Sequence, residues 1–272
     1  MIHLVTAENL SLYEQELIDL HRARKMVFVD QLGWKLNTVD GLEIDEYDDD
    51  RAMFAIGFDI HGRVAMNGRF RPTDDGRSML VDHFSHALWS DIGPINGPHT
   101  WEFSRALSLE AGVRRHNLAR KAACMLTPLE VALAAGIGRY VGFADLAVFP
   151  FFIAMGWRVS FLGDAVFYGE GDGAAFAVEV SHEAVEEMRS KWALPAPAHV
   201  LLTREEVGST PPLAHAAALA LGGHPHAQLM PQAEPEVRRR AESRRQHSHN
   251  QRVLDRLSRR SGSIGKVAAA NS

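Results

Sequence analysis

The stretch WEFSRALSLEAGVRRHNLARKAA, residues 101–123, combines a strand pattern with a helix pattern and organises the rest of the chain. Side chains alternate along a strand, so Trp101 and Phe103 share one face while Glu102 points to the other. Regular alternation would also separate Glu102 from Arg105, since they lie an odd number of positions apart. The helix pattern then starts at Asn117, a residue suited to an N-cap.

Elements on both sides of this stretch predict a mixed α/β sheet with helices on its faces. A helix capped by Asn9 or Ser11 should follow the first strand, and the helix from Asn117 should continue to Ala135. A short helix at 151–154 should end at Gly156, and residues 181–192 should form the last helix. Extended segments are expected at 2–7, 52–59, 64–70, 79–84, 139–148, 158–163 and 174–180, the second and third forming a hairpin.

Composition restricts the class of protein. The chain has 272 residues, 46% of them hydrophobic, which is enough for a sizeable core. The N-terminal residues lack a signal-peptide pattern, and the apolar run 146–157 is too short to span a membrane, so we expect a cytoplasmic protein. The single cysteine, Cys124, excludes an internal disulfide and a cysteine metal cluster, and we expect no metal site.

Charge divides the chain into two parts. From Pro231 onward there are ten Lys and Arg against four acidic residues, about +6, which leaves about −11 on the rest of the chain. The C-terminal part has too few large apolar residues to offset the entropy of ordering. We therefore expect a catalytic or binding body at 1–208, and a linker with a basic, disordered extension at 209–272.

The acidic stretch DGLEIDEYDDD, residues 40–50, is the first candidate site. It lacks the turn glycine and terminal glutamate of a calcium loop. Carboxylates such as Asp45 and Asp48 would instead attract a cationic small molecule. Phe28 and Trp34 offer aromatic faces to such a cation, and Arg24 lies four residues before Phe28, on the same helical face.

Nine residues in order resemble a known signature, that of the acyl-homoserine-lactone synthases, the autoinducer synthases of quorum sensing. The resemblance covers roughly residues 1–200. It implies an acetyltransferase-like (GNAT-type) fold, with a mixed, mostly antiparallel sheet flanked by helices. The matching residues are Arg24, Phe28, Trp34, Asp45, Asp48, Arg69, Phe84, Glu102 and Arg105.

The resemblance also implies a reaction. An acyl group passes from a thioester, on acyl carrier protein or coenzyme A, to the amine of S-adenosylmethionine. Lactone formation then releases methylthioadenosine. S-adenosylmethionine and the acyl thioester are substrates, and no cofactor is implied.

Site roles follow from the same resemblance. A β-bulge in the strand would shift the alternation and bring Glu102 and Arg105 to one cleft. We expect Glu102 to be the base, with Asp45 second, and backbone N–H groups at the bulge to bind the oxyanion. The expected catalytic network is Glu102, Asp45, Asp48, Arg69 and Arg105, and the residues expected to bind S-adenosylmethionine are Arg24, Phe28, Trp34 and Phe84.

The arginine cluster before the long helix suggests contact with the acyl donor. Arg114, Asn117 and Ala119 follow the acetyltransferase loop pattern Q/R-x-x-G-x-G/A imperfectly, because asparagine replaces its first glycine. The segment could instead dock the acidic surface of an acyl carrier protein. The docking candidates are Arg114, Arg115, Arg120 and Lys121, with Arg139 and Arg158 beside them.

The sequence also bears on the acyl chain and on alternative functions. Residues 140–148 contain no threonine, which argues weakly against a 3-oxo acyl chain, by analogy with relatives. An N-acetyltransferase acting on another amine is the main alternative; a nucleic-acid-binding or protein-binding module acting through the basic tail ranks below it, and no membrane partner is expected. The expected acyl-pocket residues are Phe103, Leu107, Met125, Val141, Phe143, Phe149, Phe152 and Met155.

Overall fold

A computed structural model describes residues 2–59, 61–110 and 115–201. Its centre is a twisted sheet in the order β1-β4-β5-β6-β7-β10-β8, with β9 added along β10. A separate two-stranded ribbon, β2-β3, follows the first helix. The strands are β1 (Ile2–Val5), β2 (Thr38–Val39), β3 (Leu42–Glu43), β4 (Met53–Phe58), β5 (Val64–Pro72), β6 (Thr100–Ser108), β7 (Arg139–Asp145), β8 (Val159–Phe161), β9 (Val166–Phe167) and β10 (Asp172–Glu179).

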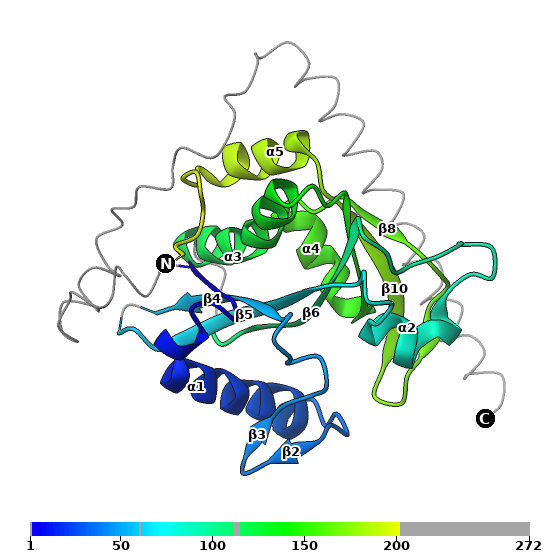
Figure 1. Cartoon of the computed structure of the whole chain (residues 1–272), viewed down its shortest axis with the longest axis horizontal. Coiled ribbons are helices and arrows are strands. Elements are labelled where there is room, and N and C mark those ends of the chain that lie inside the picture. The colour runs from blue at the N-terminus through cyan, green and yellow to red at the C-terminus, as the bar shows by residue number, and fades with distance from the viewer. Residues whose placement is uncertain (1, 60, 111–114, 202–272) are drawn as a thin grey trace.

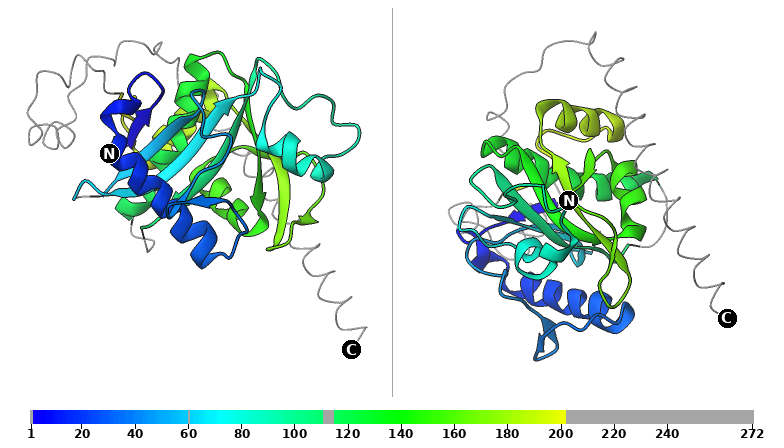
Figure 2. Two further views of the ribbon diagram at one scale, coloured as in Figure 1. Left: turned by 60° about the horizontal axis from the view of Figure 1, so that its bottom comes forward. Right: turned by 90° about the vertical axis from the view of Figure 1, so that its right-hand side faces the viewer.

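Helices cover both faces of the sheet. Figure 1 shows α3, α4 and α5 on one side and α1 on the other, and the right-hand view of Figure 2 shows the same layers from the side. The helices are α1 (Glu14–Arg24), α2 (Met79–Phe84), α3 (Arg115–Ala134), α4 (Phe149–Met155) and α5 (His182–Trp192), with single turns η1 (Leu10–Leu12), η3 (Ser85–Ala87) and η4 (Leu146–Val148), and a π-helical segment η2 (Lys25–Gln31) that continues α1.

Among the named strands of the described residues, only β6 and β7 pair in parallel, and their ladder is short. β6 and β7 pair only from Thr100–Arg139 to Glu102–Val141, after which the two strands diverge. Gly142 lies at this divergence, where an added Cβ would lie 2.6 Å from the Phe103 carbonyl oxygen. Glycine is therefore required for β6 to pass so close to β7 before the strands separate.

Strand alternation divides the core between the two faces. Beneath α3, α4 and α5, one large cluster includes Phe103, Tyr140 and Trp157. The opposite face carries two smaller clusters, one against α1 and one that includes Leu80 of α2 and Val141 of β7. Polar side chains occupy the sheet surface between these smaller clusters, and the candidate site lies there.

The segment MLVDHF, residues 79–84, was expected to be extended, but it forms α2. The Ser78 hydroxyl caps it by accepting a hydrogen bond from the Val81 N–H at 3.2 Å. The Glu102 carboxylate accepts from the Met79 and Leu80 N–H groups at 2.9 and 2.7 Å. A negative charge at a helix N-terminus is stabilising, and this one comes from a distant strand that local sequence does not reveal.

The expected caps of two helices are also corrected. The Asn9 side chain accepts from the Thr6 N–H and donates to the Leu4 carbonyl, which fixes the turn after β1. The residue before α1 is Tyr13, which makes no side-chain cap, so neither Asn9 nor Ser11 fills that role. Asn117 lies inside α3 instead of preceding it.

The described body ends along the edge of β1. Val200 pairs with this strand through N–H to carbonyl bonds with Ile2 and Leu4, each 2.8 Å long. Buried Glu130 of α3 accepts from the Ala198 N–H at 2.9 Å and contacts His199 Nδ1 at 3.1 Å. The expected boundary at 208 and the extension at 209–272 lie outside the described residues. No helix within the described ranges is long and apolar enough to cross a membrane.

Candidate active site

The bulge predicted in β6 is present. Asn67 of β5 pairs with Leu107, but Arg69 pairs with Ser104, so two residues of β6 stand opposite Gly68 alone. Arg105 occupies the bulge with a φ of 52°, a conformation that non-glycine residues rarely adopt. Its backbone carbonyl accepts a hydrogen bond from the Asn67 side chain at 3.0 Å.

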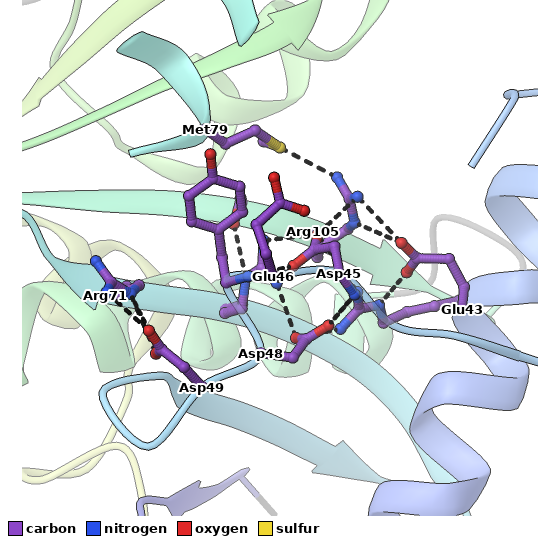
Figure 3. A network of polar contacts seen from close by, with 12 residues as sticks. Glu43, Asp45, Glu46, Asp48, Asp49, Arg71, Met79 and Arg105 are labelled. Atoms are coloured by element: carbon purple, nitrogen blue, oxygen red, sulfur yellow. Dashed lines mark hydrogen bonds and ion pairs between the residues drawn. The ribbon is translucent and has the colours of Figure 1, made fainter. Parts of the chain in front are cut away.

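The bulge brings Arg105 to the same face as Glu102. Arg105 Nη1 lies 3.3 Å from the sulfur of Met79, the residue whose N–H donates to Glu102. Figure 3 shows the Arg105 guanidinium between Met79 and Glu43. The bulge thus places both charged residues of β6 on one face of the sheet, but only Arg105 lines the cavity described below.

Six buried or nearly buried side chains form what we call the charge cluster: Arg24, Arg69, Arg105, Glu43, Asp45 and Asp48. Arg24, the last residue of α1, donates through Nε to Glu43 at 2.5 Å and through both terminal nitrogens to Asp48 at 2.7 and 2.9 Å. Its fork-shaped guanidinium therefore joins β3 to the loop that follows it.

The strands supply the other two guanidinium groups of the charge cluster. Arg69 of β5 binds both Asp45 and Asp48, the latter at 2.8 Å, and also donates to Ser104. Arg105 Nη2 lies 3.0 Å from Glu43 and 2.7 Å from Asp45. Three positive and three negative groups alternate, so the charge cluster is formally neutral, which makes its burial tolerable.

Burial alone would raise the pKa of the Asp45 and Asp48 carboxyls. The Arg69 guanidinium beside both of them, together with Arg105 at Asp45 and Arg24 at Asp48, instead holds each pKa below its ordinary value. Both aspartates are therefore ionised at neutral pH. The same pairing raises the pKa of Arg69.

We expect folding to weaken in acid because of this pairing. A carboxyl whose pKa is lowered on folding stabilises the protein fully above its unfolded value, near 3.8 for Asp45 and Asp48, and progressively less as the pH falls below it. The free energy of unfolding, measured with urea, should fall by about 2 kcal/mol or more between pH 7 and pH 3. Glu102, whose pKa is raised by burial, offsets part of this loss.

The exposed Asp19–Arg22 pair provides the control for this acid effect. Asp19→Asn should leave the pH profile unchanged, because exposed pairs contribute little. The loss should also persist in 0.5 M salt, because buried pairs are weakly screened. Equal stability at pH 7 and pH 3 would contradict the role of the paired aspartates.

Glu102 stands apart from the ion pairs. Both of its oxygens accept from N–H groups of α2, its side chain is 2% exposed, and it forms no ion pair within the part of the chain that the structure describes. Burial raises its pKa, and the Leu80 and Met79 N–H groups oppose that rise. This geometry makes Glu102 the anchor of α2, and Glu102 is not among the residues that line the cavity described below.

A cavity of about 410 Å³ opens over the charge cluster. Of the five residues expected to be catalytic, Asp45 and Arg105 line it. Asp48 and Arg69 lie beneath and are nearly inaccessible. The lining consists of Trp34, Lys35, Leu36, Asn37, Glu43, Asp45, Glu46, Tyr47, Met79, His83, Phe84, Arg105, Phe143, Ala144, Asp145, Tyr168 and Glu170.

The charge of this lining is strongly negative. Its carboxylates outnumber its lysine and arginine groups by five to two. Three of those carboxylates, which we call the mouth acids, lie outside the charge cluster: Glu46, Asp145 and Glu170. A partly desolvated cleft of this kind concentrates cationic ligands.

Aromatic residues form the side of the cavity near the N-terminal helix. The Trp34 ring stacks on Phe28 with centroids 5.0 Å apart and planes 9° from parallel. Phe28 is buried behind Trp34 and lies 5.9 Å from the Arg105 guanidinium carbon. Of the residues expected to bind the sulfonium substrate, Trp34 and Phe84 line the cavity, whereas Arg24 and Phe28 support it from beneath.

The expected acyl-pocket residues are divided between the two faces of the sheet. Phe143 lines the cavity. Val141 belongs to the small cluster against α2, and Leu107 is buried in β6. The rest lie in the large cluster on the opposite face, where Trp157 packs edge-on against Phe103 with centroids 4.8 Å apart: Phe103, Met125, Phe149, Phe152 and Met155.

Most of the expected docking arginines that the structure describes are engaged within the chain. Arg120 pairs with Glu110 at 2.7 Å, and Arg158 pairs with Glu179 and Glu187. Arg139 donates to Thr100 and to the carbonyls of two loop residues. Lys121 is half-buried on α3, Arg114 lies outside the described residues, and Arg115 is described only as backbone of α3.

Sequence reasoning missed Glu43, Asp145 and Tyr168. Glu43 had a usable signal, because it stands two positions before Asp45, as residues on one face of an extended segment do. Asp145 and Tyr168 reach the cavity through the divergence of β7 and the turn between β9 and β10, which local pattern does not reveal. Within the described ranges, no group of three or more His, Cys, Asp or Glu is arranged to hold a metal ion.

The sheet is mostly antiparallel, with a bulge in β6 against β5 and a divergence of β6 from β7. These features define an acetyltransferase-like α/β fold with a ligand cavity at the divergence. The autoinducer synthase family model matches residues 8–188, so the chain belongs to the autoinducer synthase family. Its relatives are acyl-homoserine-lactone synthases, and it is an acyltransferase of that class.

Two curated relatives and one solved structure illustrate the similarity. An acyl-homoserine-lactone synthase of Rhizobium etli is 29% identical over 58% of this chain and 74% of its own. An isovaleryl-homoserine lactone synthase of Bradyrhizobium diazoefficiens is 28% identical over 72% of this chain and 87% of its own. The structure of a CoA-dependent acyl-homoserine lactone synthase, BjaI, with SAM and isopentyl-CoA matches 82% of this chain and 99% of its own, at 25% identity and a TM-score of 0.63.

Proposed function

We propose that this synthase transfers an acyl group from an acyl-CoA to the amine of S-adenosylmethionine and then closes the lactone ring with release of methylthioadenosine. The observation that carries the proposal is the acidic, aromatic cavity above a neutral, rigid charge cluster. The sulfonium and ammonium groups of S-adenosylmethionine outweigh its one carboxylate, which suits a lining rich in carboxylates.

Distinct groups of the cavity suit the three charged groups of this substrate. The Trp34 face suits the sulfonium, because an indole attracts a nearby cation. Arg105, the cluster guanidinium that lines the cavity, suits the substrate carboxylate. Asp45 suits the ammonium, since it is the cluster aspartate that reaches the cavity and is 12% exposed.

In the first step, the neutral amine attacks the thioester carbonyl, the C–N bond forms and the C–S bond breaks. The nitrogen becomes positively charged during the attack, and the ionised Asp45 carboxylate stabilises that charge and accepts its hydrogen bond. The nitrogen's proton passes through water to the departing thiolate, which leaves as coenzyme A. An amine with a pKa near 8 supplies enough neutral form at neutral pH.

In the second step, a carboxylate oxygen of the acylated substrate attacks the carbon attached to sulfur. A C–O bond forms, the C–S bond breaks, and its electron pair neutralises the sulfonium as methylthioadenosine leaves. No proton is transferred, so the protein contributes mainly orientation. The double anchoring of Arg105 by Glu43 and Asp45 provides a fixed guide for that carboxylate.

Acyl-CoA is the donor that the observations favour. The isovaleryl-homoserine lactone synthase relative and the CoA-dependent neighbour support it. The engagement of Arg120, Arg139 and Arg158 within the chain leaves fewer positive groups for an acidic carrier protein. The absence of a threonine in 140–148 still argues for an acyl chain without a 3-oxo group.

The decisive experiment incubates the purified full chain with S-adenosylmethionine and matched panels of acyl-CoA and acyl carrier protein thioesters. We expect methylthioadenosine and an acyl-homoserine lactone to form in equal amounts from a short acyl-CoA. Turnover with carrier-protein thioesters alone would overturn the donor assignment. Acylation of another amine without consumption of S-adenosylmethionine would favour the N-acetyltransferase alternative.

Trp34→Ala should weaken binding of S-adenosylmethionine more than folding. Loss of the indole face should raise the dissociation constant by about tenfold, because a cation–π attraction of roughly 1–2 kcal/mol is lost. Calorimetry measures the binding, and urea unfolding measures the stability. Trp192→Ala is the control: its indole donates to the Met155 carbonyl on the opposite side of the sheet, so it should lower stability without changing binding. Unchanged affinity in Trp34→Ala would contradict the role of Trp34.

A further inference from the structure

Two segments far apart in the sequence meet at the cavity through aromatic rings. Trp34 follows the π-helical segment η2, and Tyr168 lies in the turn between β9 and β10. Their ring centroids are 6.1 Å apart and their planes are 87° from parallel, an edge-to-face contact. Such pairs are favourable beyond the area they bury.

Tyr168 is itself fixed by a second contact. Its hydroxyl donates to Asp145 Oδ2 at 3.3 Å, and Asp145 Oδ1 accepts from the Ala147 N–H at 2.7 Å, which holds the carboxylate at the end of β7. Gly171 allows the close approach, because an added Cβ would lie 3.0 Å from Asp145 Oδ2.

The Tyr168 hydroxyl stays protonated under working conditions. Burial, and then the negative Asp145 beside it, raise the pKa of Tyr168 to about 12. The nearby Trp34 indole opposes part of that rise. The hydroxyl can therefore donate to Asp145 while the ring of Tyr168 contacts the Trp34 indole.

The contact belongs to a continuous arc of five rings around the cavity. Phe143 meets Tyr168 edge-on with centroids 5.6 Å apart, and Phe84 stacks on Phe143 at 4.0 Å. At the other end, Trp34 stacks on Phe28. Tyr168 is the middle member, and it connects the helical side of the cavity to the strand side.

We propose that Tyr168 is a positioning residue, whose hydroxyl, fixed by Asp145, holds the Trp34 indole over the cavity and so strengthens binding of the sulfonium substrate. This inference rests on the proposed function. Without the hydroxyl, the ring of residue 168 loses its bond to Asp145 and no longer holds the Trp34 indole in a fixed edge-to-face contact. We therefore expect removal of the hydroxyl to weaken substrate binding without slowing the chemical step.

The first test needs no ligand. The protein is labelled with 5-fluorotryptophan, and the resonance of Trp34 among the five tryptophans is assigned by its absence in Trp34→Phe. Tyr168→Phe should shift or broaden the Trp34 signal and leave the other four in place. An unchanged Trp34 signal would overturn the inference.

The second test measures binding and turnover with S-adenosylmethionine. Tyr168→Phe should raise its dissociation constant and KM by about threefold to tenfold, the weight of one hydrogen bond, while kcat at saturation stays within about twofold. The double variant Trp34→Phe/Tyr168→Phe should lose less affinity than the two single losses multiplied, because both remove the same interaction.

Tyr140→Phe is the matched control. It also loses a hydroxyl, which donates to the Pro128 carbonyl at 2.8 Å within the core on the other side of the sheet. It should lower stability and leave the affinity unchanged. A protein that binds S-adenosylmethionine equally well with and without the Tyr168 hydroxyl overturns this inference alone, whereas a wild-type chain that binds none overturns the proposed function.

Discussion

Arg69→Met is expected to destabilise the protein by about 3–5 kcal/mol, the cost of breaking a buried ion pair from one side. Arg69 is fully buried and lies between Asp45 and Asp48, so its removal leaves two carboxylates facing each other without their shared cation. Methionine restores volume without charge or donors. Urea unfolding at pH 7 measures the effect.

Two further variants separate charge from geometry at this position. Arg69→Lys keeps the charge but cannot bind two carboxylates and Ser104 at once, so we expect an intermediate loss. Arg22→Met removes an exposed partner of Asp19 and should change stability by less than about 1 kcal/mol. If Arg69→Met were as stable as Arg22→Met, the charge cluster would not contribute to folding.

Asp45→Asn should lower kcat by about a hundredfold to a thousandfold, the range for losing one group that stabilises charge in the transition state. Asp45 is the cluster aspartate that reaches the cavity, where the amine must become positively charged during attack. Asparagine preserves the shape but removes the negative charge that stabilises this state. Steady-state formation of methylthioadenosine, with saturating acyl-CoA, measures the loss.

Asp50→Asn is the control for this substitution. Asp50 lies in the same acidic stretch but is exposed and does not line the cavity, so its loss should leave kcat within about twofold. Stability must be measured in parallel, because Asp45 also pairs with Arg69 and Arg105. A folded Asp45→Asn enzyme with wild-type kcat would remove Asp45 from the chemistry.

The local sequence pattern correctly predicted those helices and strands whose formation is determined by residues within or next to the element itself. The hairpin of β4 and β5 follows from two apolar runs around a turn, and α5 follows from Ser181, which accepts from the Ala184 N–H. The end of α4 at Gly156, with a φ of 122°, was likewise predicted. The prediction that Asp45, Asp48, Arg69 and Arg105 lie together rested on a family resemblance and on the shift in side-chain alternation that a bulge causes.

The misses have a common cause, which is contact between distant segments. α2 is anchored by Glu102, a residue of another element, and its own sequence reads equally well as a strand. The catalytic role expected of Glu102 stays a prediction, and its two N–H partners in α2 were not visible in the sequence. The expected acyl-pocket residues also stay a prediction. They were chosen by hydrophobicity, which did not reveal that most of them lie on the face of the sheet beneath α3 and α4.

The mouth acids and the neutral charge cluster have different roles. The mouth acids attract a cationic substrate from a distance, and the charge cluster orients the substrate once it is bound. A neutral set of paired groups projects little field into solvent, so long-range attraction of a cation depends on the mouth acids and fades within a Debye length of about 8–10 Å. Orientation of the bound molecule depends on the rigid interior, which salt screens weakly. Substitutions in the mouth acids can therefore change the rate of substrate capture without changing the orientation of the bound substrate, which depends on the charge cluster.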